Sequence, residues 1–168
     1  MKKLMLTAAM VFATVGMSFA QNSAGQPVTI NASVIQAIQL SVNTATLNLG
    51  TLIAGTTPTP VDPTTSPIQF TLTGNGNSLI HITFAAVTLN GPSSSTLTFT
   101  PNLNGDPSSA NQASPSNLNI ASGSTVTLSG ANYSSSNYYF WLGGGVGSIG
   151  AGQTPGAYSG TFTLTVAY

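Results

Sequence analysis

Charge is almost absent from this sequence of 168 residues, which contains two lysines, two aspartates, one histidine and neither arginine nor glutamate. Both lysines stand at the start, as Lys2 and Lys3. Binding to nucleic acid or to anionic lipid depends on Lys and Arg side chains, so the rest of the chain excludes those partners. An uncharged surface also does not repel its own copies, which favours a subunit that associates with other subunits.

Cysteine is absent as well, so the chain has no disulfide and no thiol chemistry. The one histidine, His81, and the two aspartates, Asp62 and Asp106, are too few for a structural zinc site. A weak calcium site that combines Asp106 with carbonyl and asparagine oxygens stays open. We therefore predict no structural metal centre and no cofactor.

The first twenty residues have the organisation of a secretory signal peptide. Lys2 and Lys3 precede an apolar run over residues 4–17, and residues 18–20, Ser-Phe-Ala, have the small-x-small pattern of a cleavage site. An N-terminal membrane anchor is the alternative, but the run is short for a membrane span. The sequence therefore predicts a leader over residues 1–20, export, and one domain over residues 21–168.

Two stretches alternate apolar and polar residues with a period of two, the pattern of a β-strand with one apolar face. The first covers residues 28–42, with a break at Ile35 and Gln36 that indicates a bend or a bulge. Its leading apolar residues are Val28, Ile30, Ala32 and Val34. The second follows a Pro-Gly turn at residues 155–156. Its apolar residues are Tyr158, Phe162, Leu164, Val166 and Tyr168.

Shorter strands are expected between these two stretches. They fall at residues 47–49, 68–72, 79–89, 97–99, 118–120, 126–128 and 138–142, separated by Gly, Pro and Asn. Residues 55–67 carry four prolines and are expected to form a surface connection, and the glycines at 143–145 are expected to end the strand before them. The predicted fold class is all-β, an antiparallel β-sandwich or barrel.

The motifs that could support chemistry fail on their context. Residues 145–150, Gly-Val-Gly-Ser-Ile-Gly, match the dinucleotide fingerprint, but glycine and proline follow where a helix must begin. A Ser-His-Asp site would need His81, and no Gly-x-Ser-x-Gly elbow accompanies it. Paired carboxylates would have to be Asp62 and Asp106, each beside a proline. We therefore predict that the protein is not an enzyme and has no catalytic residue.

The aromatic run over residues 138–141, Tyr-Tyr-Phe-Trp, has two interpretations. Trp141 and its neighbours could form a platform on which a sugar stacks, so Trp141 is a candidate ligand-stacking residue. A core strand is the simpler interpretation, because alternation sends only every second ring to solvent.

Three segments resemble an uncharacterised bacterial family of exported, Gly/Thr-rich domains. They are the ending at residues 153–168, the Leu-Asn-Leu-Gly at 47–50, and the Gly-Gly-Gly at 143–145. That family is similar in turn to fimbrial subunits of the chaperone–usher type and to spore coat protein U domains. The resemblance spans most of residues 28–168. It implies an immunoglobulin-like sandwich secreted to the bacterial periplasm, cell surface or medium, and a periplasmic chaperone as a further partner.

These observations predict a structural surface protein, a pilin-like or coat-like subunit that assembles by strand exchange with its own copies or with other surface subunits. Half of residues 28–42 would add to an open sheet edge of a neighbour, where backbone hydrogen bonds supply affinity. A self-complete adhesin or carbohydrate-binding module that uses Trp141 is the alternative. A terminal aromatic residue also ends outer-membrane β-barrel chains, but strands of about five to seven residues are short for a membrane.

Overall fold

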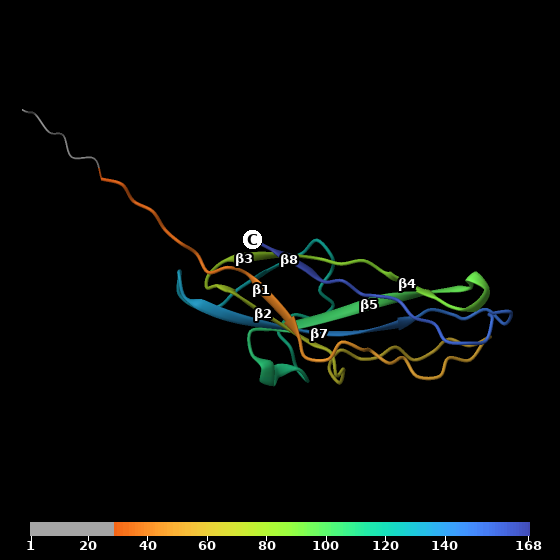
Figure 1. Cartoon of the computed structure of the whole chain (residues 1–168). Helices are drawn as coiled ribbons and strands as arrows, with labels where there is room; N and C mark the ends of the chain where they lie inside the picture. Colours follow the sequence, from red (N-terminus) through yellow and green to blue (C-terminus); the bar gives the residue numbers. More distant parts are fainter. Residues whose placement is uncertain (1–28) are drawn as a thin grey trace, which may run out of the picture. The chain divides into compact units, whose positions relative to one another are not determined.

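The computed structural model describes residues 29–168 and divides the chain into two units, Met1–Ser33 and Val34–Tyr168. The predicted leader and Val28 lie outside the described residues. Residues 29–33 of the first unit have no regular secondary structure. The second unit contains the described strands (Figure 1).

The strands pair into two antiparallel sheets. The larger sheet has the order β1-β2-β7-β5-β4 and the smaller has the order β6-β3-β8. The strands are β1 (Gln39–Val42), β2 (Gln69–Asn75), β3 (Leu79–Thr83), β4 (Val87–Asn90), β5 (Thr96–Asp106), β6 (Thr125–Thr127), β7 (Ser135–Val146) and β8 (Thr165–Ala167). Two 3-10 turns, η1 (Pro92–Ser94) and η2 (Ser109–Asn111), complete the described elements, none of which is an α-helix. The predicted all-β sandwich is confirmed.

The core lies between the two sheets, because each sheet turns the apolar face of its alternating strands inward. In β3, Ile80 and Ile82 are buried while the other three residues of the strand are exposed. In β7, Tyr138, Phe140 and Leu142 contribute to the same cluster. Burying one such side chain stabilises the fold by about 1.5–3 kcal/mol. The alternation read from the sequence therefore corresponds to the core.

Strands β5 and β7 run further than the sequence predicts. β5 continues through Pro101 to Asp106, and β7 continues through the three glycines to Val146. The two strands pair from Phe99↔Val146 to Asp106↔Tyr139. The prediction that glycines 143–145 end the strand is wrong, because these glycines let other segments approach β7 closely. Val61, from the proline-rich connection, forms an isolated bridge with Gly144.

Other expected strands are shorter than predicted or do not form. In the described part of the chain, residues 29–38 and 44–60 form no strand, so β1 is all that forms of residues 28–42. Residues 118–120 also form no strand, and the C-terminal alternation forms a strand only in β8. Its apolar parity is kept, because Leu164 is buried while Thr163 and Thr165 are exposed. β1 and β8 each stand at the edge of a sheet. Figure 1 shows β3 and β8 in the layer above β1, β2 and β7.

Candidate functional site

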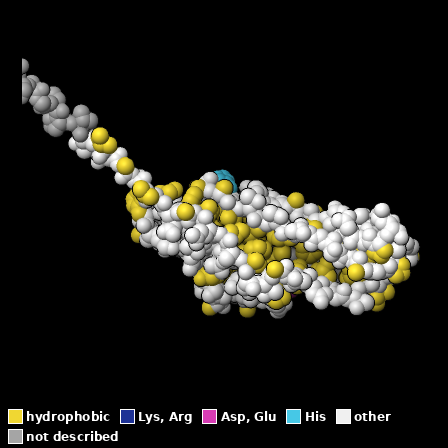
Figure 2. All heavy atoms as spheres, viewed as in Figure 1, with side chains coloured by type: hydrophobic (Ala, Val, Ile, Leu, Met, Phe, Trp, Pro, Cys, Tyr) yellow, Lys and Arg dark blue, Asp and Glu magenta, His cyan; other side chains and the backbone are white. Residues whose placement is uncertain are grey.

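The sandwich is open on one side, between the segment that follows β1 and the segment that precedes β8. Residues 44–52 form one wall and residues 153–162 form the other wall of a groove of about 1010 Å³. Figure 2 shows hydrophobic atoms exposed in a furrow on this face. The described residues that line the groove include no Asp, Glu, His, Lys or Arg. It is therefore suited to apolar side chains.

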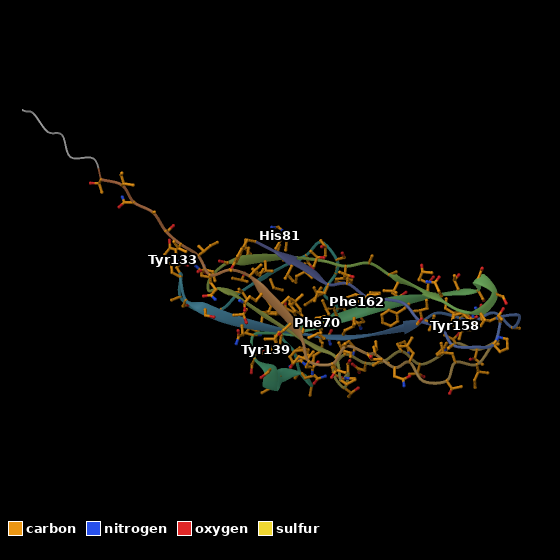
Figure 3. The ribbon with its side chains drawn as sticks, viewed as in Figure 1. Phe70, His81, Tyr133, Tyr139, Tyr158 and Phe162 are labelled. Atoms are coloured by element: carbon orange, nitrogen blue, oxygen red, sulfur yellow. The ribbon has the colours of Figure 1, made fainter. Side chains whose placement is uncertain are left out.

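The groove floor is built from the inward face of the larger sheet. Phe70 comes from β2, Val87 from β4 and Phe99 from β5. The ring of Phe162 lies 6.2 Å from the ring of Phe70 and 5.9 Å from the ring of Phe84. Figure 3 shows Phe70 and Phe162 in the middle of the sandwich and Tyr158 towards one end. The aromatic rings thus partly close the groove at the level of Phe70 and leave it open beyond.

The backbone of both walls has few partners. Among the described residues, no backbone–backbone hydrogen bond involves residues 44–52 or residues 160–162. In the rest of the second wall, Ser159 exchanges two backbone hydrogen bonds with Asn90 of β4, and the Gln153 amide donates to the Gly150 carbonyl. One polar exception is the Gly50 amide, which donates to the Asn48 side chain over 2.8 Å. Backbone amides and carbonyls need hydrogen-bond partners, and an unpaired edge pairs readily with another strand. Residues 44–52 and residues 160–162 therefore have backbone groups that could pair with an added strand, whereas the second wall is held to β4 at Ser159.

A polar cluster closes the far end of the groove. The Tyr158 hydroxyl donates to the Thr154 carbonyl over 2.7 Å and accepts from the Gln153 side-chain amide over 2.7 Å. It also lies 2.9 Å from the Ser95 hydroxyl. The Gln153 amide donates further to the Thr96 carbonyl over 3.2 Å. These bonds tie the second wall to the start of β5, so the groove has one well-defined end.

The C-terminal residue, Tyr168, ties the chain ahead of β1 to the opposite end of the sandwich. Its hydroxyl accepts from the Asn75 amide over 2.7 Å and donates to the Gln36 carbonyl over 2.6 Å. Tyr168 was predicted only as an apolar edge residue, because a period of two does not indicate what a hydroxyl group bonds to. Gln36 is thereby held beside the last residue of β2.

The predicted strand-exchange residues are exposed where they are described. We call residues 29–34 the arm. Ile30 is 88% exposed and Val34 is 87% exposed, and Ala32 is exposed as well. Val28, the fourth predicted residue, lies outside the described residues. The two large side chains thus expose apolar surface in an otherwise polar segment, which is a feature of interaction sites.

Trp141 lies in the interior, with 1% of its surface exposed. It stands on β7 with the parity opposite to the core residues Phe140 and Leu142, so it belongs to the outer face of the larger sheet. The proline-rich connection approaches this face, since a Cβ on Gly143 would lie 2.3 Å from the Val61 carbonyl oxygen. The Trp141 ring therefore offers no face on which a ligand could stack.

The few titratable side chains lie on different elements. His81 is exposed on β3, Asp62 is exposed in the proline-rich connection, and Asp106 is buried at the end of β5. Within residues 29–168, no three His, Cys, Asp or Glu side chains gather where a metal ion could bind. No helix begins after the glycine motif at residues 145–150. These residues therefore do not come together in one candidate site.

Asp106 organises the loop after β5. Its carboxylate accepts from the Ser108 amide over 2.7 Å, the Ser116 amide over 2.8 Å and the Asn111 side chain over 3.0 Å. Burial by itself raises the pKa of Asp106, but these hydrogen bonds lower it by more, so the pKa lies below its usual 3.8. The Thr64 amide donates to the Asp62 carboxylate over 2.9 Å and likewise lowers the pKa of Asp62.

Stability is expected to fall as the pH drops below about 4, because the unfolded chain then binds protons that folded Asp106 resists. The contribution of Asp106 is complete above its unfolded pKa and is lost as the pH passes down through its folded pKa. Melting temperatures measured between pH 2 and pH 6 test this. Asp106→Asn should flatten the acid limb of the profile more than the matched variant Asp62→Asn. Equal profiles for the two variants would show that the loop bonds do not stabilise the fold.

The comparisons with known proteins place the chain in a family. No helix in residues 29–168 has the length and apolar character that a membrane crossing requires. No curated protein matches the chain in sequence. A family profile matches residues 6–168, which is nearly the whole sequence. The chain belongs to this family, which is described as a domain of unknown function, DUF4402.

Proposed function

We propose that the protein is a non-enzymatic, exported structural subunit of a bacterial surface that assembles by addition of a β-strand from another subunit. The observation that carries this proposal is the apolar groove between two wall segments in which residues 44–52 and 160–162 make no backbone–backbone hydrogen bond among the described residues. A strand in the groove would give both walls hydrogen-bond partners and would cover the apolar floor. One bound segment would therefore both pair with the wall backbone and cover the apolar floor.

The arm has the composition that such a groove requires. Ile30, Ala32 and Val34 alternate with Thr29, Asn31 and Ser33, so an extended arm has one apolar and one polar face. The apolar face matches an uncharged floor, and the polar face suits the solvent side. The near absence of charge adds no repulsion between copies. Pilin-like or coat-like assembly, with a chaperone holding the subunit before assembly, agrees with these properties.

Size measurements on residues 21–168 test the proposal. The chain is expected to form oligomers whose size increases with concentration, whereas residues 35–168, which lack the arm, should remain monomeric. A clean monomer of residues 21–168 with a cooperative melt at high concentration would contradict strand addition.

Adding the missing strand as a peptide gives an independent measurement. A synthetic peptide of residues 26–36, at about 100 times its dissociation constant, should stabilise residues 35–168 by about 2.7 kcal/mol. That corresponds to a rise of several degrees in melting temperature, about 2–8 °C per kcal/mol for domains of this size range. A peptide of the same composition in scrambled order is the control and should produce no rise.

The alternative of a carbohydrate-binding module that uses Trp141 lacks support, because the Trp141 ring is buried. Glycan binding that Trp141→Ala abolishes, with the fold intact, would restore it.

A further inference from the structure

We infer that the outer face of the larger sheet binds a neutral polysaccharide, with the Tyr139 ring as the surface on which a sugar ring packs. This face is the opposite side of the sheet from the groove, so the inference does not depend on the proposed assembly. It adds a binding site and a class of ligand to the structural role.

Tyr139 is the ring of the aromatic run that a ligand can reach. On β7 it has the parity opposite to the buried core residues Tyr138 and Phe140, so its side chain belongs to the outer face of the sheet. Figure 3 shows Tyr139 on the side of the larger sheet that faces away from Phe162. Further along the same face Trp141 is buried where the proline-rich connection approaches, whereas Tyr139 is partly exposed. The open part of the outer face therefore includes an accessible aromatic ring.

The strand register surrounds this ring with uncharged polar side chains. Two neighbouring rows cross β1, β2 and β7 on the outer face, and each of their side chains is exposed or partly exposed. The rows are Ser41, Thr71, Tyr139 and Gln39, Thr73, Asn137. Adjacent strands lie about 4.8 Å apart and the two rows about 7 Å apart, so the patch measures about 10 Å by 7 Å. A patch of this size accommodates a short stretch of a sugar chain.

Hydrogen bonds between the strands hold the polar groups beside the ring. The Thr73 hydroxyl donates to Oδ1 of Asn137 over 2.9 Å, and Nδ2 of Asn137 lies 3.5 Å from the Tyr139 hydroxyl. A side-chain amide has two N–H donors, and a tyrosine hydroxyl both donates and accepts. The second Nδ2 hydrogen of Asn137 and the hydroxyl hydrogen of Tyr139 can therefore donate to a ligand. Groups that are already held in place lose less conformational entropy on binding.

The loop after β5 borders the patch on the side of Tyr139 opposite to Thr71. Asp106 is the register partner of Tyr139 on β5, and its buried carboxylate accepts hydrogen bonds from three residues of this loop. Figure 1 shows the loop with η2 below the larger sheet. The Asp106 charge is thus used within the loop, and the patch is bounded towards β5 and open towards β2 and β1.

The lack of charge on this face selects the class of ligand. Besides Asp106, the only Asp, Glu, His, Lys or Arg residues within residues 29–168 are His81 on β3 and Asp62 in the proline-rich connection. A face without Lys or Arg offers no partner for phosphate, sulfate or carboxylate groups. A neutral sugar needs no such partner, because its hydroxyls exchange hydrogen bonds with amides and hydroxyls while its C–H face packs on an aromatic ring. The patch therefore fits a neutral polysaccharide better than an acidic one.

Depletion of residues 21–168 from solution by insoluble cellulose, chitin, starch or mannan tests the site, with tubes lacking polymer to correct for protein that sediments alone. We expect the wild type to bind at least one of these polymers. Tyr139→Ala should weaken that binding at least about tenfold, the usual cost of truncating a ring at the centre of a contact. Tyr139→Phe, which keeps the ring, should weaken it less. The matched control is Tyr133→Ala, which removes a 64% exposed tyrosine from the loop before β7 and should bind as the wild type does.

A second variant keeps the test decisive if Tyr139→Ala does not fold, as its melting curve would reveal. Asn137 is exposed, so Asn137→Ala should leave the fold intact and still weaken binding, because it removes donors beside the ring. Unchanged binding by folded Tyr139→Ala or by Asn137→Ala would overturn the site. An equal loss in Tyr133→Ala would reveal unspecific adsorption through tyrosines and would overturn it too. A wild type that binds none of the four polymers would overturn the class of ligand.

Discussion

Ile30→Asp is expected to abolish assembly of residues 21–168 while leaving the melting temperature of the sandwich unchanged. Ile30 is 88% exposed, so its replacement removes no packing from the fold. In the filled groove, however, the aspartate would be placed over an apolar floor without a charged partner. An unpaired charge that is buried costs several kcal/mol. Each 1.4 kcal/mol is a factor of about ten in affinity, so the association should weaken at least about 100-fold.

The matched control is Asn31→Asp, one residue along the same arm. It adds the same charge, but position 31 has the polar parity and would face solvent in an inserted strand. Light scattering or sedimentation over a range of concentrations measures both variants. Strand insertion requires that Ile30→Asp is monomeric and that Asn31→Asp still assembles. Equal loss in both variants would mean that charge alone, without alternation, governs association.

Gly144→Ala is expected to lower the free energy of unfolding strongly, whereas Gly147→Ala is expected to leave it nearly unchanged. Gly144 has a φ of +121°, and a Cβ there would lie 2.3 Å from the Thr100 carbonyl oxygen. Overpacking costs about 1–3 kcal/mol, and a strained backbone region costs a similar amount. The combined loss of about 2–6 kcal/mol is a large part of a typical unfolding free energy of about 5–15 kcal/mol.

Denaturant unfolding of Gly144→Ala beside Gly147→Ala measures this effect. Gly147 follows β7 directly, and a Cβ there would meet nothing within 4 Å. We expect the Gly147 variant to unfold within about 0.5 kcal/mol of the wild type, as most surface substitutions do. A Gly144 variant that is equally stable would mean that β7 adjusts its pairing with β5 and the proline-rich connection.

The strand parity of this protein could be predicted from sequence because side chains alternate strictly along a strand. Ile80 and Ile82 in β3, and Leu164 ahead of β8, are buried as the pattern predicts. The extent of the strands could not be predicted in the same way. Pairing depends on what lies beside a strand, and the segments around Leu47 and Phe162 have no strand beside them on the groove side. They keep the alternating pattern but do not form strands.

Some residues have a tertiary role that differs from the role their local sequence pattern predicts. Glycines 143–145 are typical of a chain break, yet they lie inside β7, because a side chain there would collide with the connection that contains Val61. The sequence around Trp141 is compatible with either a core strand or a ligand platform. In the structure Trp141 is buried, because the proline-rich connection approaches the outer face of the larger sheet. Tyr158 and Tyr168 were predicted as apolar edge residues, but the Tyr158 hydroxyl closes one end of the groove and the Tyr168 hydroxyl ties Gln36 to Asn75 at the opposite end of the sandwich.

The sequence by itself determined that this is an all-β chain with alternating strands, almost without charge and with few groups capable of catalysis. Those properties follow from composition and a period of two, which are local and need no knowledge of the fold. Only the tertiary structure decided which of the alternating segments have no strand paired beside them. The groove exists because β1 and β8 end up on the edges of different sheets, and which edges remain unpaired depends on contacts between residues far apart in the chain.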